Sequence, residues 1–342
     1  MAHQHLIGGA SSEAFSTHPG YRRMFMAEKL TLGIFLPLRF YQGDMQVLAG
    51  QAEQVRKIDD YGFSAVWVRD VPLFDPAFGD AGQIFDPFVY LAFLAAHTRR
   101  ISLATGSAIF SLRHPIDLAK AAASIDRLSG GRLVMGIASG DRPLEFPAWG
   151  LQRSQRGERF SQAVSYFRQL LHPGQLTIRS QLGEIDAASF LPQPVSGAIP
   201  LIVTSSSGQS PQWIAEQADG WLTFPDATHE PQGPLRLAER IRGWRQMIPD
   251  GGFRPHMTNE WIDLVEDPDF PPTALRGGYV LKTGRRGLID LLSAWQRAGV
   301  NHAALGIQFS RRPVPEVIQE LAEEVLPFFP AGDEVPPLPG NW

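Results

Sequence analysis

The chain has 342 residues, 44% of them hydrophobic and 19% charged, and this balance excludes a wholly disordered protein. Its 31 Lys and Arg residues and 35 Asp and Glu residues give a net charge of −4 without a basic run, which argues against a nucleic-acid partner. The chain has no cysteine, so disulfides, iron–sulfur clusters, zinc–thiolate sites and cysteine nucleophiles are excluded. His3 and His5 are interpreted as bystanders and not as ligands, and no metal site is predicted.

No stretch approaches 18 consecutive apolar residues, so no membrane span is expected. Residues 1–29 lack a positively charged segment followed by an apolar one, so we interpret them as a partly ordered N-terminal extension and not as a secretory signal. Together with the absence of cysteine, these features favour a cytoplasmic location.

Eight apolar, β-branched runs recur along the chain, separated by polar or Gly/Pro loops and by helical periods. Their continuous hydrophobicity is typical of strands that are buried on both faces. The runs are 30–38, 64–70, 101–109, 132–140, 199–207, 219–225, 256–265 and 301–309. Gly62, Gly220 and Gly299 each stand between a helical period and the next run, where a glycine that ends a helix is expected.

This alternation predicts an α/β fold, a (β/α)₈ TIM barrel with insertions, over residues 30–328. A doubly wound open sheet is the alternative, but it requires a nucleotide-binding loop after the first run, and FLPLRFYQGDM is not one. Loops 73–87 and 172–198 are longer than a minimal barrel needs, and long loops on a barrel usually build the substrate site. A Pro-rich tail, 329–342, is expected on the surface.

In chain order, the first candidate site residue is Asp70, at the end of the second run. A carboxylate at the carboxyl end of a barrel strand is a candidate for catalysis, although capping the following turn explains it equally well. The loop behind it contains Phe74, Phe78 and Phe85, which would form an apolar lid over the mouth of the barrel or simply pack within the loop.

The third run contains Thr105, Gly106 and Ser107. A Gly-Ser pair weakens a strand unless something approaches its backbone closely, and a flat ring is one such ligand, while a plain bulge is the alternative. Behind it, His114 precedes Pro115 at the start of a helix, where a structural hydrogen bond is the favoured interpretation. Arg113 is either an ion-pair partner or a ligand clamp.

The fourth run ends in Ser139, Gly140, Asp141 and Arg142. The small residues let a ligand approach, and the two charged residues are able to bond to it or to pair with each other. The fifth run leads into Ser205, Ser206, Ser207, Gly208 and Ser210 before Pro211. Hydroxyls and free backbone N–H groups at the start of a helix predict a phosphate site there; a helix cap by Ser210 alone is the alternative.

Several common catalytic motifs are missing from the sequence. It contains no G-x-G-x-x-G after a strand, no G-x-x-x-x-G-K, no H-E-x-x-H and no G-x-S-x-G. An enzyme built on this barrel therefore depends on a bound cofactor or on residues spread over several strand ends.

Four segments of the chain resemble a known family: GFSAVWVRD, ISLATGSAIFSLRHP, AAASIDRLSGGRLVMGIASG and PLIVTSSSGQSPQWIAEQADGW. From about residue 30 to 328 the chain resembles the bacterial-luciferase-like, flavin-dependent oxidoreductases, and its opening segment resembles an uncharacterised subgroup of them.

The resemblance implies a barrel that binds reduced FMN, or F420 in some branches, at its C-terminal mouth. It implies a cis peptide at Gly106-Ser107 and phosphate contacts at Ser206, Ser207 and Ser210. Pro37 and Leu38, at the end of the first run, complete the predicted cofactor-binding set. The chain departs from luciferases in two places: Val71 follows Asp70 where they have a histidine, and Ser139 stands where they have a phosphate-binding arginine.

The resemblance therefore implies a monooxygenase or oxidoreductase in which reduced FMN, supplied by a separate flavin reductase, and O₂ oxygenate a small organic substrate. An F420-dependent dehydrogenase or reductase, a flavin-binding protein without turnover, and an unrelated barrel hydrolase stay open. A homodimer is compatible with the resemblance, although no apolar stripe points to one.

Overall fold

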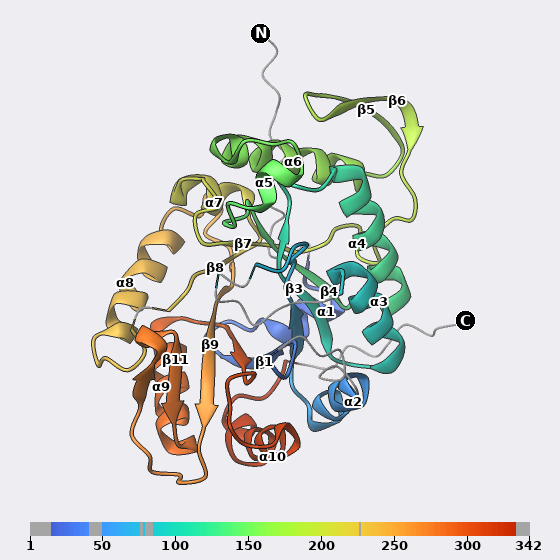
Figure 1. Ribbon diagram of the computed structural model, residues 1–342. Coiled ribbons are helices and arrows are strands. Elements are labelled where there is room, and N and C mark those ends of the chain that lie inside the picture. Colours follow the sequence, from blue (N-terminus) through green and yellow to red (C-terminus); the bar gives the residue numbers. More distant parts are fainter. Residues whose placement is uncertain (1–14, 41–49, 76–77, 79–84, 226, 333–342) are drawn as a thin grey trace.

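The computed structural model describes residues 15–40, 50–75, 78, 85–225 and 227–332. Eight parallel strands form its centre (Figure 1): β1 Thr31–Phe35, β2 Ala65–Val68, β3 Ser102–Ile109, β4 Leu133–Ala138, β7 Leu201–Thr204, β8 Gly220–Leu222, β9 His256–Leu264 and β12 His302–Gly306. Pairing of β12 with β1 and of β8 with β9 closes the ring. Each predicted run contains one of these strands, so the TIM barrel is confirmed and the open sheet is excluded.

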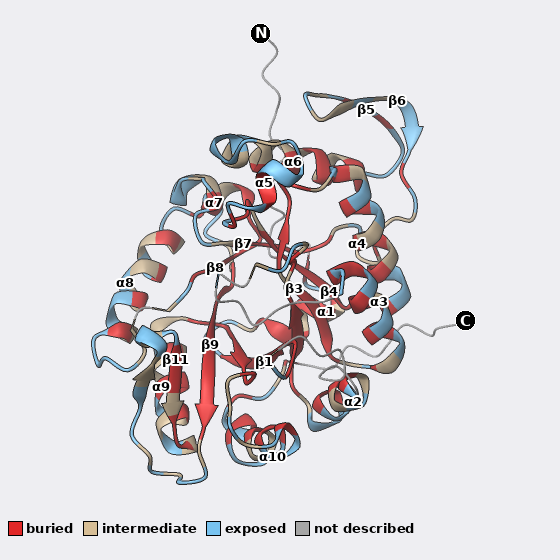
Figure 2. Cartoon of the chain, viewed as in Figure 1, coloured by how far each residue is buried: buried red, intermediate tan, exposed pale blue. Residues whose placement is uncertain are grey.

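Helices surround the barrel, and Figure 2 shows them buried on the side that faces the strands. They are α2 Gln51–Tyr61, α3 Pro87–His97, α4 Pro115–Ser129, α6 Arg156–Leu170, α7 Pro211–Gln217, α8 Gly233–Arg245, α9 Arg285–Ala298 and α10 Val314–Glu320, with the short α5 Glu145–Ala148 before α6. Gly62 and Gly299 end α2 and α9 at φ values of 95° and 99°, as predicted. Gly220 does not end a helix: it is the first residue of β8, where Ile202 and the Pro255 carbonyl leave no room for a Cβ atom.

The interior of the barrel is filled mainly by aromatic and small residues. Phe35, Trp67 and Trp261 point inward together with smaller side chains such as Ala104 and Ala304. The larger apolar cluster lies between the strands and the helices. The alternation along each strand therefore buries one side chain in the barrel and the next under a helix, which explains why the runs read as continuously hydrophobic.

The described part of the N-terminal extension belongs to the core. Helix α1, Pro19–Met24, lies against the starts of β3 and β4, where the Gly20 N–H donates to the Gly131 carbonyl at 3.0 Å and the Ser102 hydroxyl donates to the Gly20 carbonyl at 3.0 Å. Phe15 and Met24 are buried there. The segment therefore closes the N-terminal end of the barrel, away from the strand ends where the site was predicted.

The expectation that the tail lies on the surface is wrong for its first residues. Phe329 is 2% exposed and packs in the outer core, beyond the last helical turns Leu321–Val325 and Leu326–Phe328. The N–H of Gly332 donates to the carbonyl of Arg23 at 2.8 Å, so the described end of the chain is tied to α1. Residues 333–342 lie outside the described residues.

The predicted loop 172–198 contains a β-hairpin, β5 Gln175–Ser180 and β6 Gly183–Ser189, which projects beside α6 in Figure 1. It leaves the end of α6 and returns along α4, where the carbonyl of Leu182 lies 2.7 Å from His114 Nε2 and Asp126 accepts from the N–H of Val195 at 2.8 Å. Because it follows a helix and not a strand, it packs on the outside of α4, and the expectation that it builds the substrate site finds no support in these contacts.

Two further strands were not predicted. β10 Thr273–Leu275 and β11 Val280–Thr283 add an edge to the outer half of β9. The turn between them carries Arg276 and Tyr279 to the end of the barrel, beside Trp261. Within the described ranges, no helix combines the length and apolar character that crossing a bilayer requires.

Candidate active site

Three of the predicted segments meet at the carboxyl ends of β3, β4 and β7. The hydroxyl of Ser107, in β3, contacts the hydroxyl of Thr204 at the end of β7. The N–H of Ser139, after β4, donates to the hydroxyl of Ser207 at 3.3 Å. Residues that are 97 and 68 positions apart in the sequence are thereby joined in one surface at the mouth of the barrel.

The peptide bond between Gly106 and Ser107 is cis, as predicted, and the pairing of β3 with β4 shifts register between Thr105 and Ala108. The close approach to Gly106 comes from inside the barrel, because a Cβ atom there would lie 2.8 Å from the ring of Phe35. The hydroxyl of Thr105 donates to the carbonyl of Gly136 at 2.7 Å and holds the bulged strand. Both the glycine and the bulge therefore have a structural reason that does not involve a ligand.

The peptide bond between Leu36 and Pro37 is also cis, which the sequence did not predict. Pro37 and Leu38 are buried at the end of β1. They stand on the rim of the barrel next to β2, since β1 pairs with β2 up to Phe35 and Trp67.

The serine segment after β7 forms a tight turn in which Ser205, Ser207 and Gly208 have positive φ values of 52°, 47° and 76°. The hydroxyl of Ser207 donates to the carbonyl of Thr204 at 2.7 Å, and that of Ser210 caps α7 by accepting from the N–H of Trp213 at 3.1 Å. Ser205 and Ser206 are exposed. The tertiary structure thus separates serines that hold the turn from serines that face outward.

Asp70 is 2% exposed, and both of its carboxylate oxygens accept hydrogen bonds. One oxygen accepts from the N–H of Ile109 at 3.0 Å and from Arg113 Nε at 2.9 Å, and the other accepts from Arg113 Nη2 at 2.8 Å. Arg113 also bonds to Asp86 at 2.8 Å. Burial alone would lower the pKa of Arg113, but the hydrogen bond and charge of Asp70 raise it above the usual range. Arg113 is therefore an ion-pair partner, and the geometry of Asp70 favours a positioning role over proton transfer.

After β4, Ser139 is buried and Gly140 has a φ of 82°. Arg142 is 9% exposed; its guanidinium lies 3.9 Å from a Glu145 oxygen and 4.8 Å from the ring centre of Phe78. The ion pair of Arg142 is made with Glu145, so the alternative of an Asp141–Arg142 pair is not what the structure shows; Asp141 is exposed.

The proposed lid is described only in part. Phe74, Phe78 and Phe85 are all more than 40% exposed. Phe78 faces Arg142, whereas Phe85 packs against Tyr90 of α3 with a ring distance of 5.2 Å. Residues 76–77 and 79–84 of this loop lie outside the described residues.

An aromatic wall on the other side of the mouth was not predicted. Trp261, in β9, lies 5.2 Å from the ring of Phe35 and 6.0 Å from that of Tyr279, and Phe309, after β12, lies 6.2 Å from Trp261. The guanidinium of Arg69 stands 5.6 Å over the Trp261 ring. The sequence feature that could have pointed to this wall is Arg69, which stands next to Asp70 at the end of a strand.

Beneath this wall, a buried polar group holds Trp67 in place. Trp67 Nε1 donates to His302 Nε2 at 2.9 Å, and His302 Nδ1 lies 2.8 Å from the hydroxyl of Thr31. Burial lowers the pKa of His302 to about 3, so the imidazole is neutral at physiological pH. The polar group that holds Trp67 is therefore hydrogen-bonded and uncharged. Within the described residues, no group of three or more His, Asp or Glu side chains has the arrangement of a metal site.

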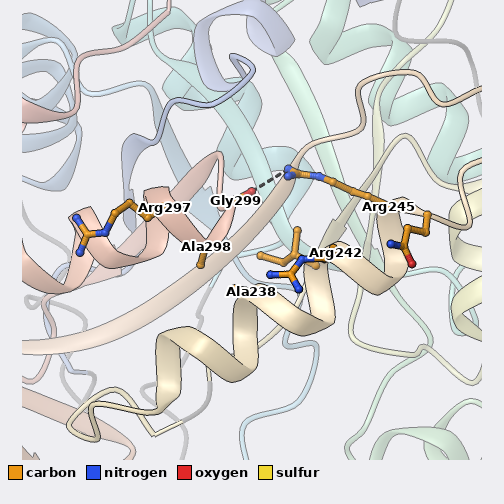
Figure 3. Close-up of a pocket in the computed structure, with 8 residues that line it drawn as sticks. Ala238, Arg242, Arg245, Arg297, Ala298 and Gly299 are labelled. Atoms are coloured by element: carbon orange, nitrogen blue, oxygen red, sulfur yellow. Dashed lines mark hydrogen bonds between the residues drawn. The ribbon is translucent and has the colours of Figure 1, made fainter.

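A hollow of about 390 Å³ lies elsewhere, between α8 and α9 (Figure 3), and its lining includes Arg242, Arg245 and Arg297. Arg245 donates to the carbonyl of Gly299 at 2.8 Å and to the Asn301 side chain at 2.9 Å. The hollow is at the ends of helices that lead into β9 and β12, hence at the opposite end of the barrel from the predicted site. Arginines at helix C-termini complement the helix dipole, which accounts for them there.

The comparisons with known proteins agree with this architecture. Residues 30–247 match the family model described as luciferase-like monooxygenase. An uncharacterised protein of Mycobacterium tuberculosis is 29% identical over 215 residues, which cover 58% of this chain and 75% of that protein. A 4-hydroxyprotoasukamycin monooxygenase of Streptomyces nodosus subsp. asukaensis is 27% identical over 50% of this chain and 48% of its own length. An F420-dependent glucose-6-phosphate dehydrogenase of Nakamurella multipartita is 25% identical over 48% and 49%.

Among solved structures, a monooxygenase from Streptomyces bottropensis superimposes with a TM-score of 0.71 at 19% identity, covering 87% of this chain and 99% of that one. An F420-dependent secondary alcohol dehydrogenase gives the same TM-score at 20% identity over 88% and 99%. These likenesses support the fold alone, but the family model covers well over half of the chain. On that match, the chain belongs to the luciferase-like monooxygenase family.

Proposed function

We propose that this chain is a flavin-dependent monooxygenase that uses reduced FMN and O₂ to oxygenate a small organic substrate. The observation that carries the proposal is the convergence of the Gly106-Ser107 segment, the Ser139–Arg142 segment and the serine turn, joined by the Ser107–Thr204 and Ser139–Ser207 contacts. The predicted flavin ring platform and the predicted phosphate turn thus lie on one surface.

The residues present fit the cofactor. Ser107, in β3, and Ser139, after β4, carry small side chains at this end of the barrel, and the ring of Phe35 packs against Gly106 from inside. In the proposal, Thr105, Gly106 and Ser107 support the ring, while Pro37 and Leu38 border it. When bound, reduced FMN supplies the electrons that activate O₂.

The phosphate of the cofactor is assigned to the turn from Ser205 to Ser210. Ser206 offers an exposed hydroxyl, which accepts a 3.4 Å hydrogen bond from the N–H of Gly208. The N–H groups of Ser205 and Gln209 donate to the carbonyls of Leu222 and Ser206, so in the proposal the N–H groups of Ser206 and Ser207 bind the anion. Ser139, Gly140, Asp141 and Arg142 flank this turn, and the guanidinium of Arg142, which pairs with Glu145 at 3.9 Å, is a cation in that neighbouring loop. In the reaction, the chain itself binds and orients the cofactor and the substrate and excludes water. Asp70 acts on the site through Arg113 and the β3–α4 connection.

The F420-dependent dehydrogenases among the relatives favour a second candidate, an F420-dependent dehydrogenase or reductase. This enzyme would not need O₂. The first proposal includes a separate flavin reductase, a homodimer and a cytoplasmic location.

The test is an equilibrium titration of the purified chain with FMN, reduced FMN, riboflavin and F420. Ser206→Ala should weaken binding of FMN by about 10- to 100-fold, because a hydrogen bond to a charged group contributes about 1.5–3 kcal/mol. Riboflavin, which lacks the phosphate, should be unaffected.

Ser207→Ala is the matched comparison, since its hydroxyl bonds to Thr204 and Ser139 within the protein. It should weaken FMN and riboflavin alike by loosening the turn. Equal losses of FMN and riboflavin in Ser206→Ala would move the phosphate elsewhere, and a preference for F420 over both forms of FMN would select the second candidate. Substrate-dependent NADH oxidation with a generic flavin reductase separates an enzyme from a flavin-binding protein without turnover.

A further inference from the structure

Gln308 is a buried side chain whose amide has no hydrogen-bond partner in the part of the chain that the structure describes. It follows β12 by two residues and is 5% exposed. Neither its Oε1 nor its Nε2 atom makes a hydrogen bond with any of the described residues. A buried amide with both groups unsatisfied costs free energy on folding, so its presence in a core position requires a reason.

The position of Gln308 connects it to the proposed flavin surface. Its Oε1 lies 3.0 Å from the point that a Cβ atom of Gly306 would occupy, and that same point is 1.8 Å from the ring of Trp261. Trp261 in turn packs on Phe35, whose ring lies against Gly106. The free amide is thus at the end of the barrel beside the aromatic wall, a short series of side-chain contacts from the cis peptide.

We propose that Gln308 recognises the polar group of the substrate, and that the substrate is a neutral, ring-bearing compound in which a carbonyl oxygen stands beside an N–H or O–H donor. This inference rests on the proposed function. The primary amide offers a donor and an acceptor side by side, and a ligand with the complementary pair satisfies both at once. The rings of Trp261, Phe309 and Tyr279 provide flat apolar contact for the remainder of the molecule.

The same chemistry argues against other substrate classes. A carboxylate would meet the amide oxygen as acceptor against acceptor, and a purely hydrocarbon substrate would leave the amide unsatisfied in the complex as well. Sites that hydrogen-bond a buried polar group of the substrate discriminate strongly against analogues that lack it. Gln308 is therefore a specificity-determining residue.

The pyrimidine edge of a flavin carries the same carbonyl and N–H pattern, so the experiment must separate substrate from cofactor. Three nearly isosteric probes, benzamide, acetophenone and α-methylstyrene, offer an acceptor with a donor, an acceptor alone, and neither. Their affinities for the FMN-loaded protein are measured by calorimetry for the wild type, Gln308→Met and the control Gln217→Met, a buried glutamine at the end of α7.

For wild type, the ratio of benzamide affinity to α-methylstyrene affinity should exceed that of Gln308→Met by about 25-fold, because each of two hydrogen bonds contributes about fivefold. The ratio of acetophenone affinity to α-methylstyrene affinity should be about fivefold higher in wild type than in Gln308→Met. Gln217→Met should keep the wild-type ratios, and FMN affinity should be unchanged in both variants.

Thermal unfolding provides an independent readout. Without ligand, Gln308→Met should be as stable as wild type or more stable, because an apolar side chain of similar shape removes two unsatisfied polar atoms. A clear loss of stability would mean that the amide is bonded within the protein, and would overturn the proposal.

Equal affinity ratios in wild type and Gln308→Met, or no binding of benzamide to wild type at millimolar concentration, would also overturn it. A loss of FMN affinity in Gln308→Met would assign the residue to the cofactor instead. If wild type binds neither FMN nor F420, the proposed function itself fails, whatever Gln308 does.

Discussion

Replacing Asp70 by asparagine tests whether this carboxylate positions the site or takes part in the chemistry. The substitution keeps the size of the side chain, but it removes the charge that faces Arg113 at 2.8 Å and places an NH₂ group opposite a donor. Breaking a buried ion pair costs about 3–5 kcal/mol. The Arg113 side chain is 28% exposed and keeps Asp86 at 2.8 Å, so we expect the lower value, about 3 kcal/mol.

For 342 residues the entropy of unfolding is about 0.7 kcal/mol/K, so this loss lowers the Tm by about 4 °C. Calorimetry measures the Tm, and substrate-dependent NADH oxidation with a flavin reductase measures turnover. Adding Arg113→Met should not destabilise the protein further, because the unpaired guanidinium is then gone. If Asp70→Asn keeps the Tm of the wild type but abolishes turnover, Asp70 acts in the reaction and the positioning role is wrong.

Three further results are expected. Gly306→Ala should displace Trp261, which lies 1.8 Å from the new Cβ atom, and should cost about 1–3 kcal/mol in urea unfolding, whereas Gly243→Ala, in open space on α8, should be neutral or stabilising. Burial raises the pKa of Glu260 to about 7, so its contribution to stability falls as pH rises from about 4.5 to 7; relative to wild type, Glu260→Gln should be equally stable near pH 4.5 and about 3 kcal/mol more stable at pH 8. Burial lowers the pKa of His256 and of His302 to about 3, so the stability of the wild type should decrease as pH falls below about 6.5, and urea midpoints that stay constant between pH 7 and 4 would contradict this.

Features that depend on neighbouring residues were predictable. Ser210 and His114 cap α7 and α4 because their side chains reach N–H groups only two or three residues ahead. The aromatic wall was not predictable in the same way. Trp261, Tyr279 and Phe309 come from β9, from the turn before β11 and from the segment after β12, and the turn was not anticipated at all.

The candidate site also has features that were predictable from the sequence and features that were not. Its segments were predicted from small residues and serines at strand ends, but the role of each side chain was not. Ser206 and Ser207 are equivalent in the sequence, yet only Ser207 is turned inward to bond with Thr204 and Ser139. The sequence does not show a partner for the carboxylate of Asp70, and the structure places Arg113, 43 residues later, against it.

The eight strands could be recognised from the sequence because burial on both faces leaves a continuous hydrophobic run in each of them, whatever their order in space. The burial of Phe15 and Phe329, and the Gln308 amide that no described residue satisfies, were decided only by the tertiary structure. The physical reason is that a hydrophobic period and a helix cap are properties of a few consecutive residues. The partner of a polar group, or its lack of one, depends on which distant segments packing brings together.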